Sequence, residues 1–298
     1  MDTFILHLFN RQLAHPALDV VMILASTIGL AALPATAIHY WLQGETKLAR
    51  AIWAALLMGL LATFVFQFLA WRPRPEDVRL LLAQPPFPSF PSGHVVAAFA
   101  TAMVLILATR NWSISIASLL VALLISVSRI YLGQHYPTDV LAGMVLGLTI
   151  GAACYGIFVQ TGQVRDRLRW LLFPQIAIAI LVSMMAYMDL LPRNLLEWPY
   201  ADKVMHFLLW GLLAGWLHIW LPGKGWQIAK QSLPLAVLIP FSIAIVEEGF
   251  QSFSPLRTAD FTDLAADLCG LFLFWWISRW LTETRPVGTP EFRTQIKV

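Results

Sequence analysis

The sequence predicts an all-α protein that crosses a membrane many times. Hydrophobic residues make up 58% of the 298-residue chain and charged residues only 12%, about half of their usual share in soluble globular proteins. Mean hydropathy is +0.69, which is too high for a soluble fold of this size and opposite to a disordered chain. Because a transmembrane helix needs roughly 20 apolar residues, the chain can hold several spans.

Nine apolar segments, each long enough for a membrane-spanning helix, follow one another along the chain. They cover about residues 17–42, 49–70, 92–109, 112–130, 138–160, 169–191, 204–221, 233–250 and 262–281. A short helix lying in the membrane interface is expected before them, because apolar residues recur there at helical spacing. These residues are Phe4, Ile5, Leu8, Phe9 and Leu13, with Asn10 and Arg11 off their stripe.

A basic connector at residues 161–170 divides the chain into two membrane modules. We expect one module at 1–160, a second at 171–285 and a cytoplasmic tail at 286–298. Most Lys and Arg residues fall on the side opposite the 71–91 loop, and positive charge marks the cytoplasmic side. The loop is therefore predicted to face the exterior. The net charge of +3 gives no indication of a nucleic-acid partner, and the oligomeric state is not indicated.

Three polar stretches interrupt the apolar pattern, all on the predicted outer side. Ionisable residues at a membrane boundary are costly, so we interpret these stretches as functional. They are Arg72-Pro73-Arg74-Pro75, then Pro91-Ser92-Gly93-His94, and finally Ser128-Arg129 followed by His135 and Asp139.

All three stretches contribute residues that suit the binding of a phosphate group. Ser92 and Gly93 lie at a predicted helix start, where Gly93 allows close approach and the free N–H groups of the first turn favour an anion. Arg74 and Arg129 can each grip phosphate oxygens with a planar fork of N–H donors.

The third stretch adds a nucleophile. His135 and Asp139 are four residues apart, so one helical turn places them on the same face. A carboxylate bonded to one ring nitrogen leaves the other free to attack phosphorus, and His94 can protonate the leaving oxygen. With two arginines supplying positive charge, this set predicts phosphoryl transfer without a metal ion or other cofactor.

These stretches resemble the signature of the type 2 phosphatidic acid phosphatase family, K-x6-R-P, P-S-G-H and S-R-x5-H-x3-D. The second and third patterns match in full, whereas the first matches only as Arg74-Pro75, with Gln67 at the position of the family's Lys. The resemblance implies that His135 forms a phosphohistidine, that Asp139 orients it and that His94 protonates the leaving group.

The same resemblance assigns the phosphate-binding residues, which are Arg74, Arg129, Ser92 and Gly93. Gln67 removes one positive charge from this set. We expect Arg72, two residues from Arg74 in a proline-bent segment, to compensate in part.

The second half has a polar cluster of its own on the predicted outer side. It consists of Asp202, Lys203, His206, Glu248, Gln251, Arg257, Asp260, Asp263 and Asp267. The cluster resembles the VanZ-like pattern Asp-Lys-x-x-His, Glu-x-x-Gln and Arg-x-x-Asp-x-x-Asp, with Asp267 where that family usually has Asn. This resemblance points to the cell envelope but implies no reaction. We interpret the cluster as either a binding site or a structural ion-pair network, and expect no metal site.

Together these features predict a phosphatase of the bacterial cytoplasmic membrane whose active site faces the periplasm or exterior. Undecaprenyl diphosphate is the first candidate substrate, with phosphatidylglycerol phosphate, phosphatidic acid and lipid A phosphate as rivals. A lipid phosphotransferase, or a non-catalytic lipid-binding or transport protein with a degenerate pocket, remains an alternative. Vanadium-dependent haloperoxidases share this type of pocket, but the membrane spans and Gln67 argue against that reading.

Overall fold

The computed structural model describes residues 2–192, 198, 200–228, 231–251, 253 and 260–283. Within them, nine helices coincide with the nine predicted apolar segments. They are α2 (Pro16–Leu42), α3 (Thr46–Ala70), α4 (Gly93–Thr109), α5 (Trp112–Tyr131), α6 (Pro137–Phe158), α8 (Leu172–Tyr187), α10 (Ala201–Trp220), α11 (Leu235–Gln251) and α12 (Phe261–Glu283). Six helical stretches of the described residues are long and apolar enough to cross a membrane, and α4 is a shorter apolar helix. The predicted class is confirmed, while the number of spans stays a prediction.

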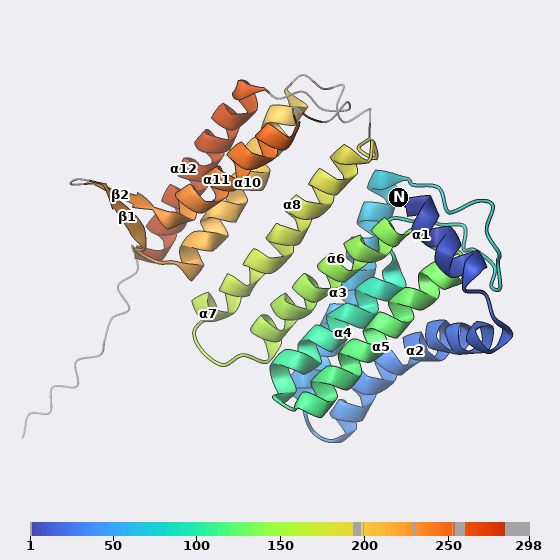
Figure 1. The fold of residues 1–298 in the computed structure, drawn as a ribbon. Helices are drawn as coiled ribbons and strands as arrows, with labels where there is room; N and C mark the ends of the chain where they lie inside the picture. Colours follow the sequence, from blue (N-terminus) through green and yellow to red (C-terminus); the bar gives the residue numbers. More distant parts are fainter. Residues whose placement is uncertain are drawn as a thin grey trace, which may run out of the picture.

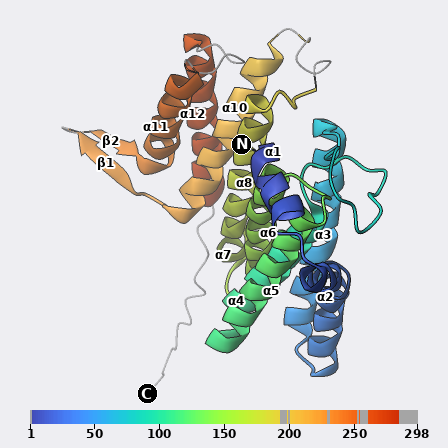
Figure 2. The same ribbon diagram turned by 45° about the vertical axis from the view of Figure 1, so that its right-hand side comes forward.

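The first module is a bundle in which α4 occupies the centre. This helix contacts α2, α3, α5 and α6 (Figures 1 and 2). Val96, Ala100 and Val104 of α4 are fully buried and pack with Ile52 of α3 and Leu146 of α6. The helix that carries the second motif is thus surrounded by protein, which fixes the position of its first turn.

Small residues allow α4 and α6 to approach closely. A Cβ atom placed on Gly143 would lie 2.8 Å from the carbonyl oxygen of Ser92, and Gly147 and Gly151 meet backbone carbonyls of α4 even more closely. Close backbone approach through small residues is a common mode of helix packing in membranes. Here it brings the start of α4 against the first turns of α6, so that the second and third motifs become neighbours.

The N-terminal segment forms the predicted short helix, as α1 (Asp2–His7) followed by the π-helix η1 (Leu8–Gln12). Its buried face differs from the prediction, which placed Asn10 on the polar side. Asn10 is fully buried, and its amide donates to the carbonyls of Arg79 and Tyr131 and accepts from Arg79 N–H, each at 2.8 Å. Through its hydrogen bonds with Arg79, the Asn10 amide holds this segment against the loop between α3 and α4.

The connector between the modules forms α7 (Val164–Leu168) and the 3-10 helix η2 (Arg169–Leu171). Trp170 packs against Gly156 and Tyr155 of α6, and α8 contacts both α6 and α10. The predicted boundaries of the two modules stay a prediction, because α8 shares buried residues with both.

In the second module, α10 packs closely on α12, with α11 against both (Figure 1). A two-stranded antiparallel hairpin, β1 (Gly225–Ile228) and β2 (Gln231–Pro234), follows α10 and was not predicted. Its strands are only four residues long, too short for a periodic signal. The chain direction places the starts of α4, α6, α10 and α12 at one end of the molecule, so the two predicted polar clusters share that end.

Candidate active site

The third motif lies where α5 ends and α6 begins. Gly133 has a φ of +67°, which favours glycine, and it turns the chain so that His135 points inward with 2% exposure. Pro137 occupies the start of α6, where a missing N–H costs nothing. Asp139 follows in the first turn, fully buried, and its Oδ2 accepts a 2.9 Å hydrogen bond from Tyr136 N–H.

Hydrogen bonds define which nitrogen of His135 is free. Its Nδ1 lies 2.8 Å from the carbonyl oxygen of Ser89 and 3.6 Å from Asp139 Oδ2. Both oxygens can only accept, so Nδ1 carries the proton and Nε2 presents its lone pair. Nε2 lies 3.4 Å from Arg74 Nη1, and an anion bound by Arg74 would therefore meet the free nitrogen.

Burial also keeps this imidazole neutral. It lowers the pKa of His135 to about 4, although the neighbouring Asp139 carboxylate opposes the shift. An unprotonated ring is the form that can attack phosphorus. The location of His135 therefore favours the nucleophilic form throughout the neutral pH range.

Two arginines converge on this histidine. Arg74 donates to the carbonyl oxygens of Phe87 and Gln134, each at 2.8 Å, which fixes its guanidinium next to His135. Arg129 is buried at the end of α5 and donates from Nη1 to the Ser26 hydroxyl of α2. Its Nε–H has no acceptor among the described residues, and a phosphate oxygen would supply one.

The second motif faces the same space. Ser92 precedes α4, its N–H donates to the carbonyl oxygen of Asp139 at 3.1 Å, and its buried hydroxyl has no partner among the described residues. Gly93 packs against Thr63 of α3. His94, in the first turn of α4, lies within electrostatic range of Arg129, His135 and Arg74. The Ser92 hydroxyl, the first N–H groups of α4 and the His94 imidazole thus lie in the same part of the bundle as His135, and N–H groups at a helix start favour an anion.

Gln67, at the position of the family's Lys, lies beside this turn. It is buried in the last turn of α3, and its Nε2 donates a 3.4 Å hydrogen bond to the carbonyl oxygen of Pro91. A neutral amide thus holds the start of the second motif where the family pattern has a charged amine.

Arg72 is placed behind the histidine. It donates to Asp139 Oδ1 at 2.6 Å, to Thr138 Oγ1 at 2.7 Å and to Asp2 Oδ2 at 2.7 Å, and its guanidinium stacks 4.0 Å from the Tyr136 ring centre. These contacts saturate much of its hydrogen-bonding capacity. The predicted contact of Arg72 with phosphate stays a prediction, and the observed contacts describe a residue that fixes Asp139.

The polar cluster of the second half is also brought together. Lys203 Nζ lies 2.7 Å from both Asp260 and Asp263, and His206 Nδ1 lies 3.0 Å from Asp267 Oδ1. The remaining described members are Asp202 in the first turn of α10, and Glu248 and Gln251 in the last turn of α11. Arg257 lies outside the described residues.

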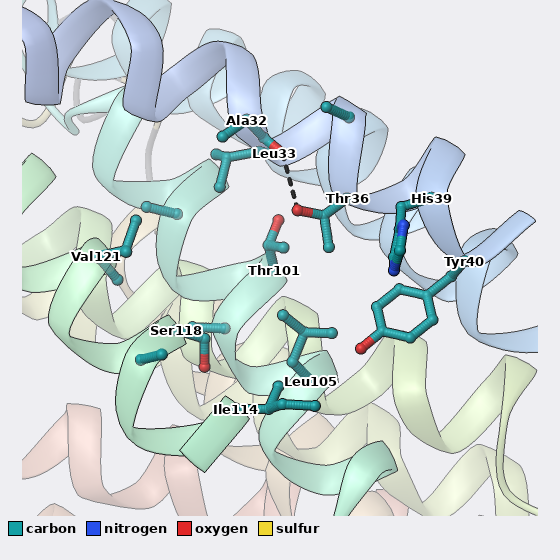
Figure 3. Close-up of a pocket in the computed structure, with 15 residues that line it drawn as sticks. Ala32, Leu33, Thr36, His39, Tyr40, Thr101, Leu105, Ile114, Ser118 and Val121 are labelled. Carbon is teal, nitrogen blue, oxygen red and sulfur yellow. Dashed lines mark hydrogen bonds between the residues drawn. The ribbon is translucent and has the colours of Figure 1, made fainter. Parts of the chain in front are cut away.

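An apolar cavity of about 480 Å³ lies deeper between α2, α4 and α5 (Figure 3). Leu33, Thr101 and Ala122 line it. Leu33 lies seven residues after Ser26 in α2, and Thr101 lies seven residues after His94 in α4. Ala122 lies seven residues before Arg129 in α5. At 1.5 Å per residue, the cavity is therefore about 10 Å below the candidate site along the same three helices.

Several residues of the site were not predicted from the sequence. Ser89 contributes only its backbone carbonyl, and Asp2 lies 137 positions before Asp139 in the chain. Asp2 also accepts hydrogen bonds from the N–H and hydroxyl of Thr138, at 3.1 and 2.6 Å. A carboxylate at a helix start is a common cap, but no spacing in the sequence connects it with this helix.

The fold and site define a polytopic membrane protein with histidine and arginine side chains gathered at one end of its first helical bundle. Residues 47–163 match the family model of the PAP2 superfamily, so this part of the chain is a PAP2 superfamily domain and the predicted family is confirmed for it. The VanZ-like resemblance of the second half stays a prediction.

The chain is also similar to individual proteins. The undecaprenyl-diphosphatase BcrC of Bacillus subtilis is 29% identical over 140 residues, which are 45% of this chain and 72% of BcrC. The putative undecaprenyl-diphosphatase YbjG of Escherichia coli is 34% identical over 39% of this chain and 61% of its own length. The crystal structure of Aquifex aeolicus LpxE aligns with a TM-score of 0.46 and 29% identity, covering 51% of this chain and 93% of LpxE. The chain thus spans only about three fifths of some of its curated relatives.

We expect Arg72→Ala to lower kcat for phosphate release about tenfold or more, because a charged hydrogen bond to the buried Asp139 is lost. Arg72→Lys should recover part of the rate. Arg11→Ala is the matched control, since Arg11 forms a largely exposed ion pair with Asp77 that contributes little. An effect confined to KM would instead place Arg72 on the substrate, and an unchanged rate would remove it from the site.

Protein stability should report the neutral state of His135. Its folded pKa of about 4 lies below the ordinary value of about 6.5, so between these pH values the unfolded chain binds more protons. Stability relative to His135→Gln should therefore fall as the pH drops from 6.5 toward 4, by on the order of 3 kcal/mol. Melting temperatures in detergent from pH 7.5 to 4.5 measure this, with the exposed His39→Gln as control. Parallel curves for wild type and His135→Gln would contradict it.

Proposed function

We propose that this chain is a membrane lipid phosphatase that removes the terminal phosphate of undecaprenyl diphosphate at the outer face of a bacterial cytoplasmic membrane. The observation that carries the proposal is the free Nε2 of a buried, neutral His135 next to Arg74. Two of the relatives reported above, BcrC and YbjG, are named an undecaprenyl-diphosphatase and a putative undecaprenyl-diphosphatase. The Lys and Arg distribution supports the outward orientation.

The proposed reaction has two steps. His135 Nε2 attacks the terminal phosphorus, the bond from phosphorus to the bridging oxygen breaks, and His94 gives a proton to the departing lipid phosphate. Water then attacks the phosphohistidine with His94 as the base, which releases inorganic phosphate and restores the imidazole. Arg74 and Arg129 neutralise the charge that develops on the phosphoryl oxygens.

The cavity below the site supports a lipid substrate. Its lining is mostly alanine, leucine and other small apolar side chains, with Thr36, His39, Tyr40, Thr101 and Ser118 as the polar exceptions. A diphosphate held by Arg74 and Arg129 would point its isoprenoid chain along α2, α4 and α5 into this space.

We expect phosphate release from undecaprenyl diphosphate to persist in EDTA and to fall by several orders of magnitude in His135→Ala. The structural reason is that two arginines supply the positive charge, with no carboxylate cluster facing His135 among the described residues. The assay uses the full chain in detergent and includes an acceptor alcohol, whose phosphorylation would identify a phosphotransferase. Strict dependence on a divalent ion would contradict the mechanism, and a complete lack of turnover would favour the non-catalytic alternative.

Filling the cavity should affect long lipids selectively. Ser118→Phe places a ring in the cavity (Figure 3), and we expect KM for undecaprenyl diphosphate to rise about tenfold, because part of the chain-binding space is lost. Isopentenyl diphosphate is too short to reach this depth, so its kinetics should not change. Ser113→Phe, on an exposed position of the same helix, is the control. Equal effects on both substrates would argue against chain binding at this place.

A further inference from the structure

The second half contains a histidine held as a metal ligand would be. His206 Nδ1 lies 3.0 Å from Asp267 Oδ1, and Asp267 is 1% exposed. Because the carboxylate accepts, Nδ1 carries the proton and Nε2 presents its lone pair. In metal sites a carboxylate commonly holds the outer nitrogen of a ligating histidine in this way.

The free nitrogen faces further donors. Asp202 Oδ1 lies 3.9 Å from His206 Nε2, and donor atoms of Asp202, His206 and Asp263 all lie within 4.8 Å of one another. Two ligands that are each about 2.0–2.2 Å from one ion are roughly 3–4 Å apart. Small side-chain rotations therefore bring the three groups onto a single cation.

One oxygen of a buried carboxylate in the same cluster lacks a hydrogen-bond donor among the described residues. Glu248 is 6% exposed, and its Oε1 accepts the N–H of Asp260, three residues before Asp263. Its Oε2 is buried with no hydrogen-bond donor among the described residues. An unpaired buried carboxylate oxygen is costly, and a cation would remove the cost.

The excess of acidic over basic side chains in this cluster also favours a bound cation. Two bases of the described residues, Lys203 and His206, lie at this end of the second module. Six carboxyl groups gather there, belonging to Asp202, Glu247, Glu248, Asp260, Asp263 and Asp267. Arg193 and Arg257, outside the described residues, would still leave acids in excess.

We propose that this cluster binds one divalent transition-metal ion, Zn²⁺ or Mn²⁺, through His206 Nε2, Asp202 and Asp263, with Glu248 completing the site. One imidazole combined with carboxylates is a donor set that both ions accept. Asp267 fixes the imidazole ring, while Lys203, whose Nζ lies 2.7 Å from both Asp260 and Asp263, balances part of the charge of these two carboxylates. The site belongs to the second module and does not depend on the proposed phosphatase activity.

The test uses the full chain, purified in detergent and stripped with chelator. Zn²⁺ and Mn²⁺ are titrated separately by calorimetry, and bound metal is counted by mass spectrometry. Wild type should bind one equivalent and gain thermal stability with the ion. His206→Gln should weaken binding at least 100-fold, and Asp267→Asn about 10–100-fold as an outer-shell change. His39→Gln is the matched control and should bind like wild type.

Three results would overturn the proposal. They are no saturable uptake of either ion by wild type, equal affinity in wild type and His206→Gln, and loss of the ion in His135→Ala, which would place it in the first module. If His206→Gln does not fold, Asp202→Asn repeats the comparison, because the Asp202 side chain is 38% exposed and tolerates substitution. If wild type takes up no metal, the excess negative charge of the carboxyl groups is instead neutralised by bound protons.

Discussion

The candidate active site depends on one fully buried carboxylate, that of Asp139. Its Oδ1 accepts from Arg72 of the first motif, its backbone carbonyl accepts from Ser92 N–H of the second, and its Oδ2 faces His135 of the third. A buried charge is tolerated only when it is paired and hydrogen-bonded. The same contacts that make Asp139 tolerable therefore fix the relative positions of three segments that are distant in the sequence.

The helical frame makes this arrangement rigid. Gly143 lets α6 approach the carbonyl of Ser92, so the partners of Asp139 meet without a long side chain between them. The second module uses a similar principle, because Lys203 of α10 pairs with acids at the start of α12. Thr138 and Glu247 line one apolar cavity of about 720 Å³ between the modules, so the two polar ends are neighbours across it.

The apolar segments predicted the nine long helices among the described residues, because the pattern of hydrophobic residues sets where a chain can enter a membrane. The motif spacing predicted that His94, His135 and Asp139 converge. It did not predict the hydrogen bond from His135 to Ser89, because any residue can offer a backbone carbonyl. Nor did it predict that Asn10 is buried and hydrogen-bonded to Arg79 and Tyr131, or that Asp2 accepts a hydrogen bond from Arg72. Both contacts depend on how the N-terminal segment packs against the rest of the first module.

The proposed mechanism requires that His135 Nε2 becomes phosphorylated during turnover. The most direct measurement is a rapid quench of the full chain with undecaprenyl diphosphate labelled at its terminal phosphate, followed by alkaline digestion and mass spectrometry. We expect the labelled phosphate on His135 of wild type. Product formation with no labelled histidine, or with the label on another residue, would contradict it.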